Sequence, residues 1–327
     1  MIFMKKQILI PLVFLIFICN ALNGCLQDYS SNSENKTIPG EDIWGIYLLN
    51  LENEDTSLIF SSQNEIEGLK IDKKIENFVF CQKIGGDEDM YREICTLKLD
   101  GSGYKRLTNN NYWDLYPTWS PDGTQIAFLS FRNENLDIYK MDADGSNIEM
   151  LFDSGFHDAD IHWEANKIVF TSNSSIWLIN EDGTNPVQIT HPPKQGQWGN
   201  ANLPFGDYDP RISPDRQKIV FSRLENDESV HGNYNFFTVN IDGSEETRLT
   251  SSGYSQGFTS WSCSGDKIVF VVSAIDDVGK YDIYIINSDG TNIQNVTPDY
   301  FPNDFLCRSA VFSDDESIIF FIGQWWV

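Results

Sequence analysis

The sequence feature that most constrains the fold is a repeated pattern, of which Tyr116 to Ser130 (YPTWSPDGTQIAFLS) is the clearest copy. Two apolar alternations flank a Ser-Pro-Asp-Gly turn. Pro presets φ, Asp hydrogen-bonds nearby backbone and Gly adopts positive φ, so this copy predicts two antiparallel strands joined tightly. The phenylalanine of the second strand occurs six times, at Phe80, Phe128, Phe170, Phe221, Phe270 and Phe320.

A second hairpin follows in five copies of the pattern, where Asp-Gly separates two further apolar alternations. Asp-Gly in that setting is a strong hairpin signal. The turn aspartates are Asp100, Asp144, Asp182, Asp242 and Asp289. Each unit therefore comprises four antiparallel strands, a to d, which is the blade of a β-propeller.

The two ends of the chain together supply the last unit. The sixth copy begins at Ser309 and provides only strands a and b. The segment 45–60 (GIYLLNLENEDTSLIF) aligns position by position with 137–152 (DIYKMDADGSNIEMLF). We therefore predict an all-β, six-bladed β-propeller with four antiparallel strands per blade. The N-terminal strands complete its last blade, which removes free sheet edges.

The repeat resembles that of the TolB family, and a similar repeat occurs in propeller domains of prolyl-oligopeptidase-like peptidases. The resemblance covers about residues 43–327, and the second blade, with YPTWSPDGTQIAFLS and DIYKMDADGSN, matches best. It implies a propeller that binds a protein at the mouth of its channel, with a role in envelope assembly or transport.

The N-terminal residues read as an export signal. Lys5 and Lys6 precede an apolar run, Ile8 to Ala21, that is too short to span a bilayer. Leu-Asn-Gly-Cys then resembles a lipobox, which implies lipid attachment to Cys25. The resulting divisions are a signal peptide with lipobox, a flexible polar tether and the propeller, at residues 1–24, 25–42 and 43–327. The expected location is the extracytoplasmic side of a membrane, through the lipid anchor.

The chain is strongly acidic, with 48 Asp and Glu against 23 Lys and Arg, a formal net charge of −25. Removing residues 1–24 removes two lysines and no acid, so the balance becomes 21 minus 48, or −27. Such a surface repels nucleic acid and anionic lipid headgroups, so neither is an expected partner. Cys81 and Cys95 are placed to lie on neighbouring strands, where a disulfide is one alternative.

The longest connections mark the face that we expect to bind a ligand. Segments 190–210 and 222–237 lengthen a d–a and a b–c connection, and both kinds of connection share one face. Variable loops on a rigid scaffold usually carry the function, although the insertions could also merely cover the ring. The side chains expected to form an amphipathic binding surface are Trp198, Phe205, Tyr208, His231 and Tyr234.

A second set of candidates occupies one register of four consecutive blades, namely Asp114, Asp158, Asp207 and Gln256. They predict a partial ring near the channel mouth that binds a ligand, a cation or a basic side chain. The alternative is that each caps the backbone entering the inner strand. His157, Asp158 and Asp160 offer imidazole and carboxylate ligands for a metal. No cofactor is predicted, with a divalent cation such as calcium as the alternative.

These features favour a non-enzymatic, TolB-like lipoprotein scaffold that binds a protein, peptide or polysaccharide on its loop-rich face. The alternative is a polysaccharide lyase or hydrolase with a carboxylate and histidine site at the channel, since paired carboxylates perform acid–base chemistry. Oligogalacturonate lyases resemble this repeat class and use a histidine-rich metal site in the channel. A convincing set of three such histidines is missing from this sequence.

Overall fold

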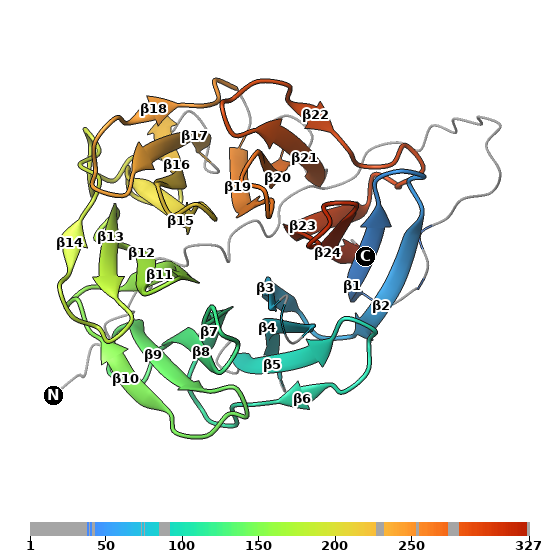
Figure 1. The fold of residues 1–327 in the computed structure, drawn as a ribbon, viewed down its shortest axis with the longest axis horizontal. Coiled ribbons are helices and arrows are strands. Elements are labelled where there is room, and N and C mark those ends of the chain that lie inside the picture. Colours follow the sequence, from blue (N-terminus) through green and yellow to red (C-terminus); the bar gives the residue numbers. More distant parts are fainter. Residues whose placement is uncertain are drawn as a thin grey trace, which may run out of the picture.

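Six four-stranded antiparallel sheets form a ring around a central channel (Figure 1). The computed structural model describes residues 38, 40, 43–72, 74, 76–84, 92–226, 232–252, 255–273 and 281–325. Within these residues all regular structure is β, so the predicted six-bladed β-propeller is confirmed. No helix in this described part is long and apolar enough to cross a bilayer.

The first five blades each consist of four consecutive strands, ordered from the channel outward. Blade one contains β3 (Ile66–Asp72), β4 (Asn77–Lys83), β5 (Arg92–Lys98) and β6 (Lys105–Arg106). Blade two contains β7 (Asp114–Trp119), β8 (Gln125–Ser130), β9 (Asp137–Asp142) and β10 (Glu149–Phe152). Blade three contains β11 (Asp158–Glu164), β12 (Lys167–Ser172), β13 (Ser175–Asn180) and β14 (Val187–Gln188).

The remaining blades follow the same plan and close the ring. Blade four contains β15 (Asp207–Ile212), β16 (Lys218–Asn226), β17 (Asn233–Asn240) and β18 (Thr247–Arg248). Blade five contains β19 (Ser255–Trp261), β20 (Lys267–Ser273), β21 (Tyr281–Asn287) and β22 (Gln294–Asn295). Blade six contains β23 (Phe305–Phe312), β24 (Ile318–Trp325), β1 (Trp44–Asn50) and β2 (Thr56–Ser62).

Blade six joins the two ends of the chain, as the alignment of segments 45–60 and 137–152 predicts. β1 pairs antiparallel with β24, and Tyr47 lies opposite Phe321. Ile38, which falls within the predicted tether, is buried in the same apolar cluster as Tyr47. Ile38 therefore packs on the propeller.

The repeated phenylalanines form the contacts between neighbouring blades. Five of the six are completely buried and Phe320 is 5% exposed. Phe270 in blade five meets Phe236 in blade four edge to face, with ring centroids 4.9 Å apart. Phe320 meets Phe78 of blade one in the same way, at 5.1 Å. Aromatic pairs of this geometry stabilise beyond their buried area, so the repeat encodes the blade interfaces directly.

In four blades a threonine after strand d hydrogen-bonds to strand c of the same blade. Its hydroxyl accepts the backbone N–H of the strand c residue fourteen positions earlier, at 2.7–3.0 Å. The threonines are Thr108, Thr190, Thr250 and Thr297. This bond recurs in the four blades whose sequence carries threonine there, because it satisfies a backbone donor that the short strand d leaves open.

The inner strand of every blade contains a β-bulge that shifts its register against strand b. Within each bulge one residue has positive φ, between 45° and 67°. These residues are Gly68, Tyr116, Asp160, Asp209, Phe258 and Ser309. A bulge re-aims the side chains that follow it. Bulge residues and those two positions later therefore line the channel.

The two cysteines of blade one are free thiols. Cys81 lies opposite Ile94, whereas Cys95 lies opposite Phe80. Because successive side chains in a strand alternate between faces, Cys81 and Cys95 point to opposite sides of the sheet. The disulfide alternative is therefore wrong, although the two residues do lie on neighbouring strands.

Candidate functional site

Three of the five side chains predicted to form the binding surface are buried. Phe205, Tyr208 and Tyr234 are 7%, 3% and 8% exposed. They pack with Leu203 and Leu224 in a small apolar cluster, in which the rings of Tyr208 and Tyr234 meet at 6.2 Å. The expectation of exposure is wrong for these three aromatics, because the insertion folds back over blade four and uses them as its own core.

The insertion before β15 therefore has a defined conformation. The backbone N–H of Gly196 donates to the carbonyl of Phe205, and that of Phe205 donates to Gln197, both at 2.8 Å. The hydroxyl of Tyr208 donates to the carbonyl of Pro204 at 2.5 Å. Trp198 lies in the loop closed by these bonds and remains 58% exposed. His231, the fifth predicted residue, lies outside the described residues.

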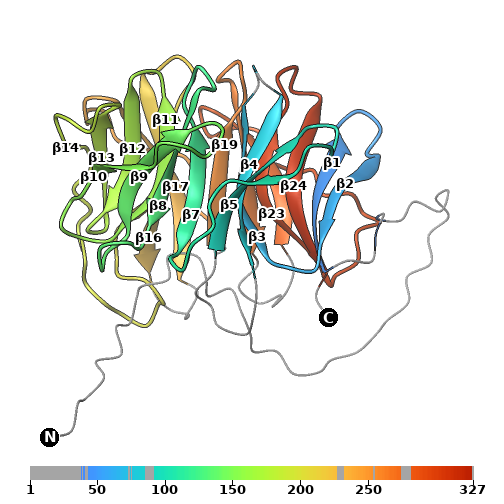
Figure 2. The same cartoon turned by 90° about the horizontal axis from the view of Figure 1, so that it is seen from below.

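A groove of about 210 Å³ lies beside Trp198 on the face formed by the b–c and d–a connections. Figure 2 shows that face at the lower edge of the disc, where β16 ends. Phe156, in the connection from β10 to β11, is 52% exposed and lines the same groove. The remaining lining residues are His157, Ala159, Thr171, Asn173, Ser174, Gly196, Leu203, Pro204 and Tyr208.

Sequence reasoning missed Phe156 because the connection that carries it is of ordinary length. The available signal is an aromatic residue between Gly155 and His157 in a turn-rich stretch. Its neighbour His157 is partly buried, and its ring stacks on Phe131 at 6.0 Å. Nδ1 of His157 accepts the backbone N–H of Leu136 at 3.1 Å, and burial lowers the pKa of the imidazole. The groove therefore presents a neutral histidine at pH 7.

The walls of the groove are fixed by contacts between the insertion and blade three. Asn173 and Ser174 form a two-residue turn, both with positive φ. Gln195 donates its side-chain N–H to the carbonyl of Asn173 at 2.9 Å. Gly206 approaches this turn so closely that a Cβ would meet Ser174 at 2.4 Å. The shape of the groove is therefore set before any ligand arrives.

The residues predicted to form a partial ring at the channel mouth are buried within the blades. Asp114, Asp158 and Asp207 are fully buried and Gln256 is 4% exposed. None of the four lines the two channel cavities described below. The bulge redirects the strand, so these side chains turn into their own blades while Asp160 and Asp209 face the channel. The expectation of a partial ring at the channel mouth is therefore wrong for this register.

Each member of this register makes hydrogen bonds within its own blade or with the connection that leads into it. Asp114 accepts from the hydroxyl of Ser130 at 2.6 Å. Asp207 accepts twice from the guanidinium of Arg223, at 2.6 and 2.8 Å. Gln256 accepts from the hydroxyl of Thr250 at 2.6 Å. These bonds secure the start of strand a, as the capping alternative predicts for buried polar side chains.

The three metal candidates do not converge on one point. Nδ1 of His157 faces a backbone amide, whereas Asp158 accepts from the hydroxyl of Ser154 at 2.5 Å. Asp160 accepts the backbone N–H of Asp209 in the next blade at 3.1 Å. Burial raises the pKa of Asp158 to about 7 and also raises that of Asp160. Across the described ranges, no cluster of three or more His, Cys, Asp or Glu could hold a metal.

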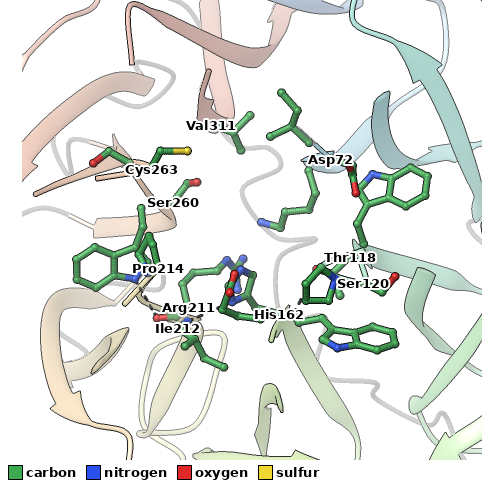
Figure 3. Close-up of a pocket in the computed structure, with 18 of the residues that line it drawn as sticks. Asp72, Thr118, Ser120, His162, Arg211, Ile212, Pro214, Ser260, Cys263 and Val311 are labelled. Atoms are coloured by element: carbon green, nitrogen blue, oxygen red, sulfur yellow. Dashed lines mark hydrogen bonds between the residues drawn. The ribbon is translucent and has the colours of Figure 1, made fainter. Parts of the chain in front are cut away.

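A larger cavity of about 400 Å³ occupies the channel mouth at the opposite face, among the a–b turns (Figure 3). Lys70, His162 and Arg211 line it from the inner strands of blades one, three and four. Below it the channel narrows to about 20 Å³ between the bulge residues. The sequence pattern predicts ligand binding on the other face, because the a–b turns on this face are short and uniform.

Comparison with known proteins identifies the relatives of this propeller. No family model matches the chain. Over 150 residues it is 28% identical to a Protein TolB homolog of Chlorobium luteolum, covering 44% of this chain and 31% of that protein. The structure of a putative TolB from Agrobacterium tumefaciens superposes with a TM-score of 0.69 at 18% identity, covering 88% of this chain and all of the other. The chain is a six-bladed β-propeller that is similar in sequence and fold to TolB proteins.

A second sequence relative extends the comparison. The TolB-like propeller is 27% identical over 181 residues to an uncharacterized protein of Agrobacterium fabrum, covering 52% of this chain and 58% of that protein. The matches thus span between about a third and three-fifths of the curated relatives. The buried aspartates of the repeat make hydrogen bonds that hold the start of their inner strands. The groove is instead formed by the insertion before β15 and by the connection that carries Phe156.

Proposed function

We propose that this TolB-like propeller is a non-enzymatic lipoprotein scaffold that binds a peptide segment of a protein partner in the groove between Phe156 and Trp198. The observation that carries the proposal is the exposure of both aromatic side chains, 52% and 58%, where they line one hollow. Exposed aromatics gathered at a hollow are typical of interaction sites. The relatives named TolB support a binding role for the propeller.

The size of the groove favours a peptide over a polysaccharide. At about 210 Å³ it is smaller than the roughly 300–1,000 Å³ usual for small-molecule sites. It has room for one or two apolar side chains, while Asn173 and Ser174 at its edge offer hydrogen bonds to a peptide backbone. The net charge of −25 favours basic residues on either side of that apolar anchor.

The fixed walls of the groove support the same proposal. Ordering loops on binding costs free energy, and a preformed hollow avoids that cost. The carboxylates required by the alternative, a channel lyase or hydrolase, are instead committed to bonds within separate blades. Asp114 and Asp207, for example, are each paired with an arginine, Arg132 at 3.0 Å and Arg223 at 2.6 Å. This arrangement favours binding over acid–base chemistry.

The proposal can be tested by selecting random peptides displayed on phage against the full-length protein. Peptides with an aromatic or aliphatic anchor and basic flanks should be enriched on the natural protein and lost on Trp198→Ala. Tyr112→Ala is the matched control, because Tyr112 is 45% exposed in a d–a connection and lies outside the groove. Equal enrichment on Trp198→Ala and the natural protein would contradict the proposal.

A further inference from the structure

The cavity at the opposite mouth of the channel concentrates positive charge in an otherwise acidic protein. Lys70, His162 and Arg211 each stand two residues beyond a bulge position, on β3, β11 and β15. They line one cavity of about 400 Å³, which is within the usual size of small-molecule sites. Figure 3 shows the side chains of His162 and Arg211 directed toward this space.

Lys70 and His162 each retain an unused hydrogen-bond donor, and Arg211 adds a buried positive charge. Lys70 makes no ion pair or hydrogen bond with any residue that the structure describes. Nδ1 of His162 accepts the backbone N–H of Ile212 at 3.2 Å, so the neutral imidazole carries its proton on Nε2. Arg211 is only 6% exposed.

The guanidinium of Arg211 is held in place by its terminal nitrogens. Nη2 pairs with Asp209 at 2.6 Å, and Nη1 donates to the carbonyl oxygens of Asp160 and Pro210 at 3.2 and 2.7 Å. Arg211 therefore contributes a fixed positive charge to the cavity.

The acidic side chains that line the cavity are already engaged. Asp72 accepts the backbone N–H of Lys74 at 2.7 Å, and Glu164 pairs with Arg216 at 3.5 Å. The wall above the three cationic or donor groups is largely apolar, formed by Ile71, Pro121, Ile212, Pro214 and Val311. The cavity therefore combines a donor-rich base with walls suited to the body of a small molecule.

We propose that this cavity binds the carboxylate or phosphate group of a small, sugar-sized ligand, with Lys70 and His162 donating to the anion and the fixed charge of Arg211 attracting it. The site is independent of the peptide groove, which lies on the other face. The negative charge of the surrounding surface makes the site selective, because only a ligand small enough to enter the channel mouth gains from its local positive charge.

The electrostatics of the site predict that binding is coupled to protonation. Burial, followed by the charge of Arg211, lowers the pKa of Lys70 to about 7, while Asp209 and Asp160 oppose that shift. Burial, Arg211 and Lys70 also hold the pKa of His162 well below 6.5. An anion beside Lys70 favours its charged form, so the affinity should fall as pH rises above 7.

Calorimetric titration of the full-length protein at pH 6.5 tests the proposal with three probes: D-glucuronate, D-glucose 6-phosphate and D-glucose. At least one charged probe should bind, whereas neutral glucose should not. Saturation by glucuronate alone assigns a carboxylate ligand, and saturation by glucose 6-phosphate alone assigns a phosphate. Affinity for the binding probe should decrease between pH 6.5 and pH 8.5.

Lys70→Met identifies the site of binding. Because Lys70 makes no hydrogen bond or ion pair with the residues that the structure describes, this variant should fold. It should bind the charged probe at least about tenfold more weakly, as expected for a lost charge-assisted bond. Lys98→Met is the matched control, since Lys98 is exposed on β5 away from the cavity and its loss changes net charge equally. The proposal is overturned if no charged probe binds, if glucose binds as tightly, or if both variants lose the same affinity.

Discussion

Tyr47 in β1 stacks on Phe321 in β24, with ring centroids 5.5 Å apart and planes inclined by 18°. Phe305 meets the edge of Tyr47 at 5.3 Å. The stack joins residues from opposite ends of the chain within one blade, so it closes the ring. Tyr47→Ala should lower the free energy of unfolding by about 3–5 kcal/mol, the usual cost of removing a buried aromatic.

Chemical denaturation of the full-length protein measures this effect, with Tyr284→Ala as the control. Tyr284 is a strand c tyrosine of blade five that stacks on Phe270 at 5.8 Å, but it is only partly buried and no chain ends meet there. Its substitution should cost clearly less. Equal losses for the two variants would show that the closing blade has no special weight in stability.

The buried carboxyl of Asp158 should make the propeller less stable at high pH. Burial raises its pKa from 3.8 to about 7. Between about pH 4 and pH 7 the folded protein therefore retains a proton that the unfolded chain releases, and stability decreases as pH rises through this window. Asp158→Asn should raise the unfolding midpoint at pH 8 by about 2 °C or more, with little change at pH 4.

Asp289→Asn provides the comparison for this pH effect. Asp289 is an exposed turn residue whose pKa is lowered by hydrogen bonds from Thr291, so its charged form is favoured in the folded state. Scanning calorimetry should show no gain at pH 8 for this variant. A pH-independent effect of Asp158→Asn would contradict the assigned role of burial.

Arg223 and Asp207 should contribute to stability and not to peptide binding. The guanidinium donates two bonds to Asp207 and also pairs with Glu246 at 2.6 Å. Arg223→Met leaves a buried carboxylate without its counter-charge and should cost about 3 kcal/mol or more. The double variant Arg223→Met with Asp207→Asn should recover part of that loss, as measured by denaturant unfolding.

Binding of phage-selected peptides provides the second readout for these variants. At a temperature where all of them are folded, peptide affinity should match that of the natural protein. Weaker peptide binding by the double variant would show that Asp207 contributes to ligand binding, which contradicts a purely structural role.

Lipid attachment at Cys25 should anchor the protein. Cys25 follows Leu-Asn-Gly directly after the apolar run of the export signal. The natural protein should incorporate labelled palmitate in cells and sediment with membranes. Cys25→Ser should abolish the label and release the propeller from the membrane fraction. Labelled Cys25→Ser, or membrane association that survives without label, would contradict the lipid anchor.

The fold was predictable because its determinants are local and repeated. The phenylalanine of strand b, the Asp-Gly turns and the match between segments 45–60 and 137–152 each specify a strand or hairpin from neighbouring residues alone. Repetition then fixes the number of blades. Closure of the ring follows, since two strands at each end of the chain lack partners unless they share a blade.

The site was less predictable because it depends on non-local packing. Phe205, Tyr208 and Tyr234 look like exposed loop aromatics, but the insertion buries them by folding over β15–β17. Strict alternation would place Asp158 and Asp207 in the channel, whereas the bulge transfers that position to Asp160 and Asp209. One sequence taken alone predicts neither the burial of these aromatics nor the bulge, because each depends on contacts between separate segments of the chain.

The most direct test of the binding scaffold is the affinity of one selected peptide for the groove. The dissociation constant of the most enriched phage-derived peptide should be measured for the full-length protein, for Phe156→Ala with Trp198→Ala, and for Tyr112→Ala. Loss of two anchoring aromatics should weaken binding by at least about a hundredfold, at roughly 1.4 kcal/mol per tenfold, while Tyr112→Ala should bind normally. Unchanged binding to the double variant would contradict the account.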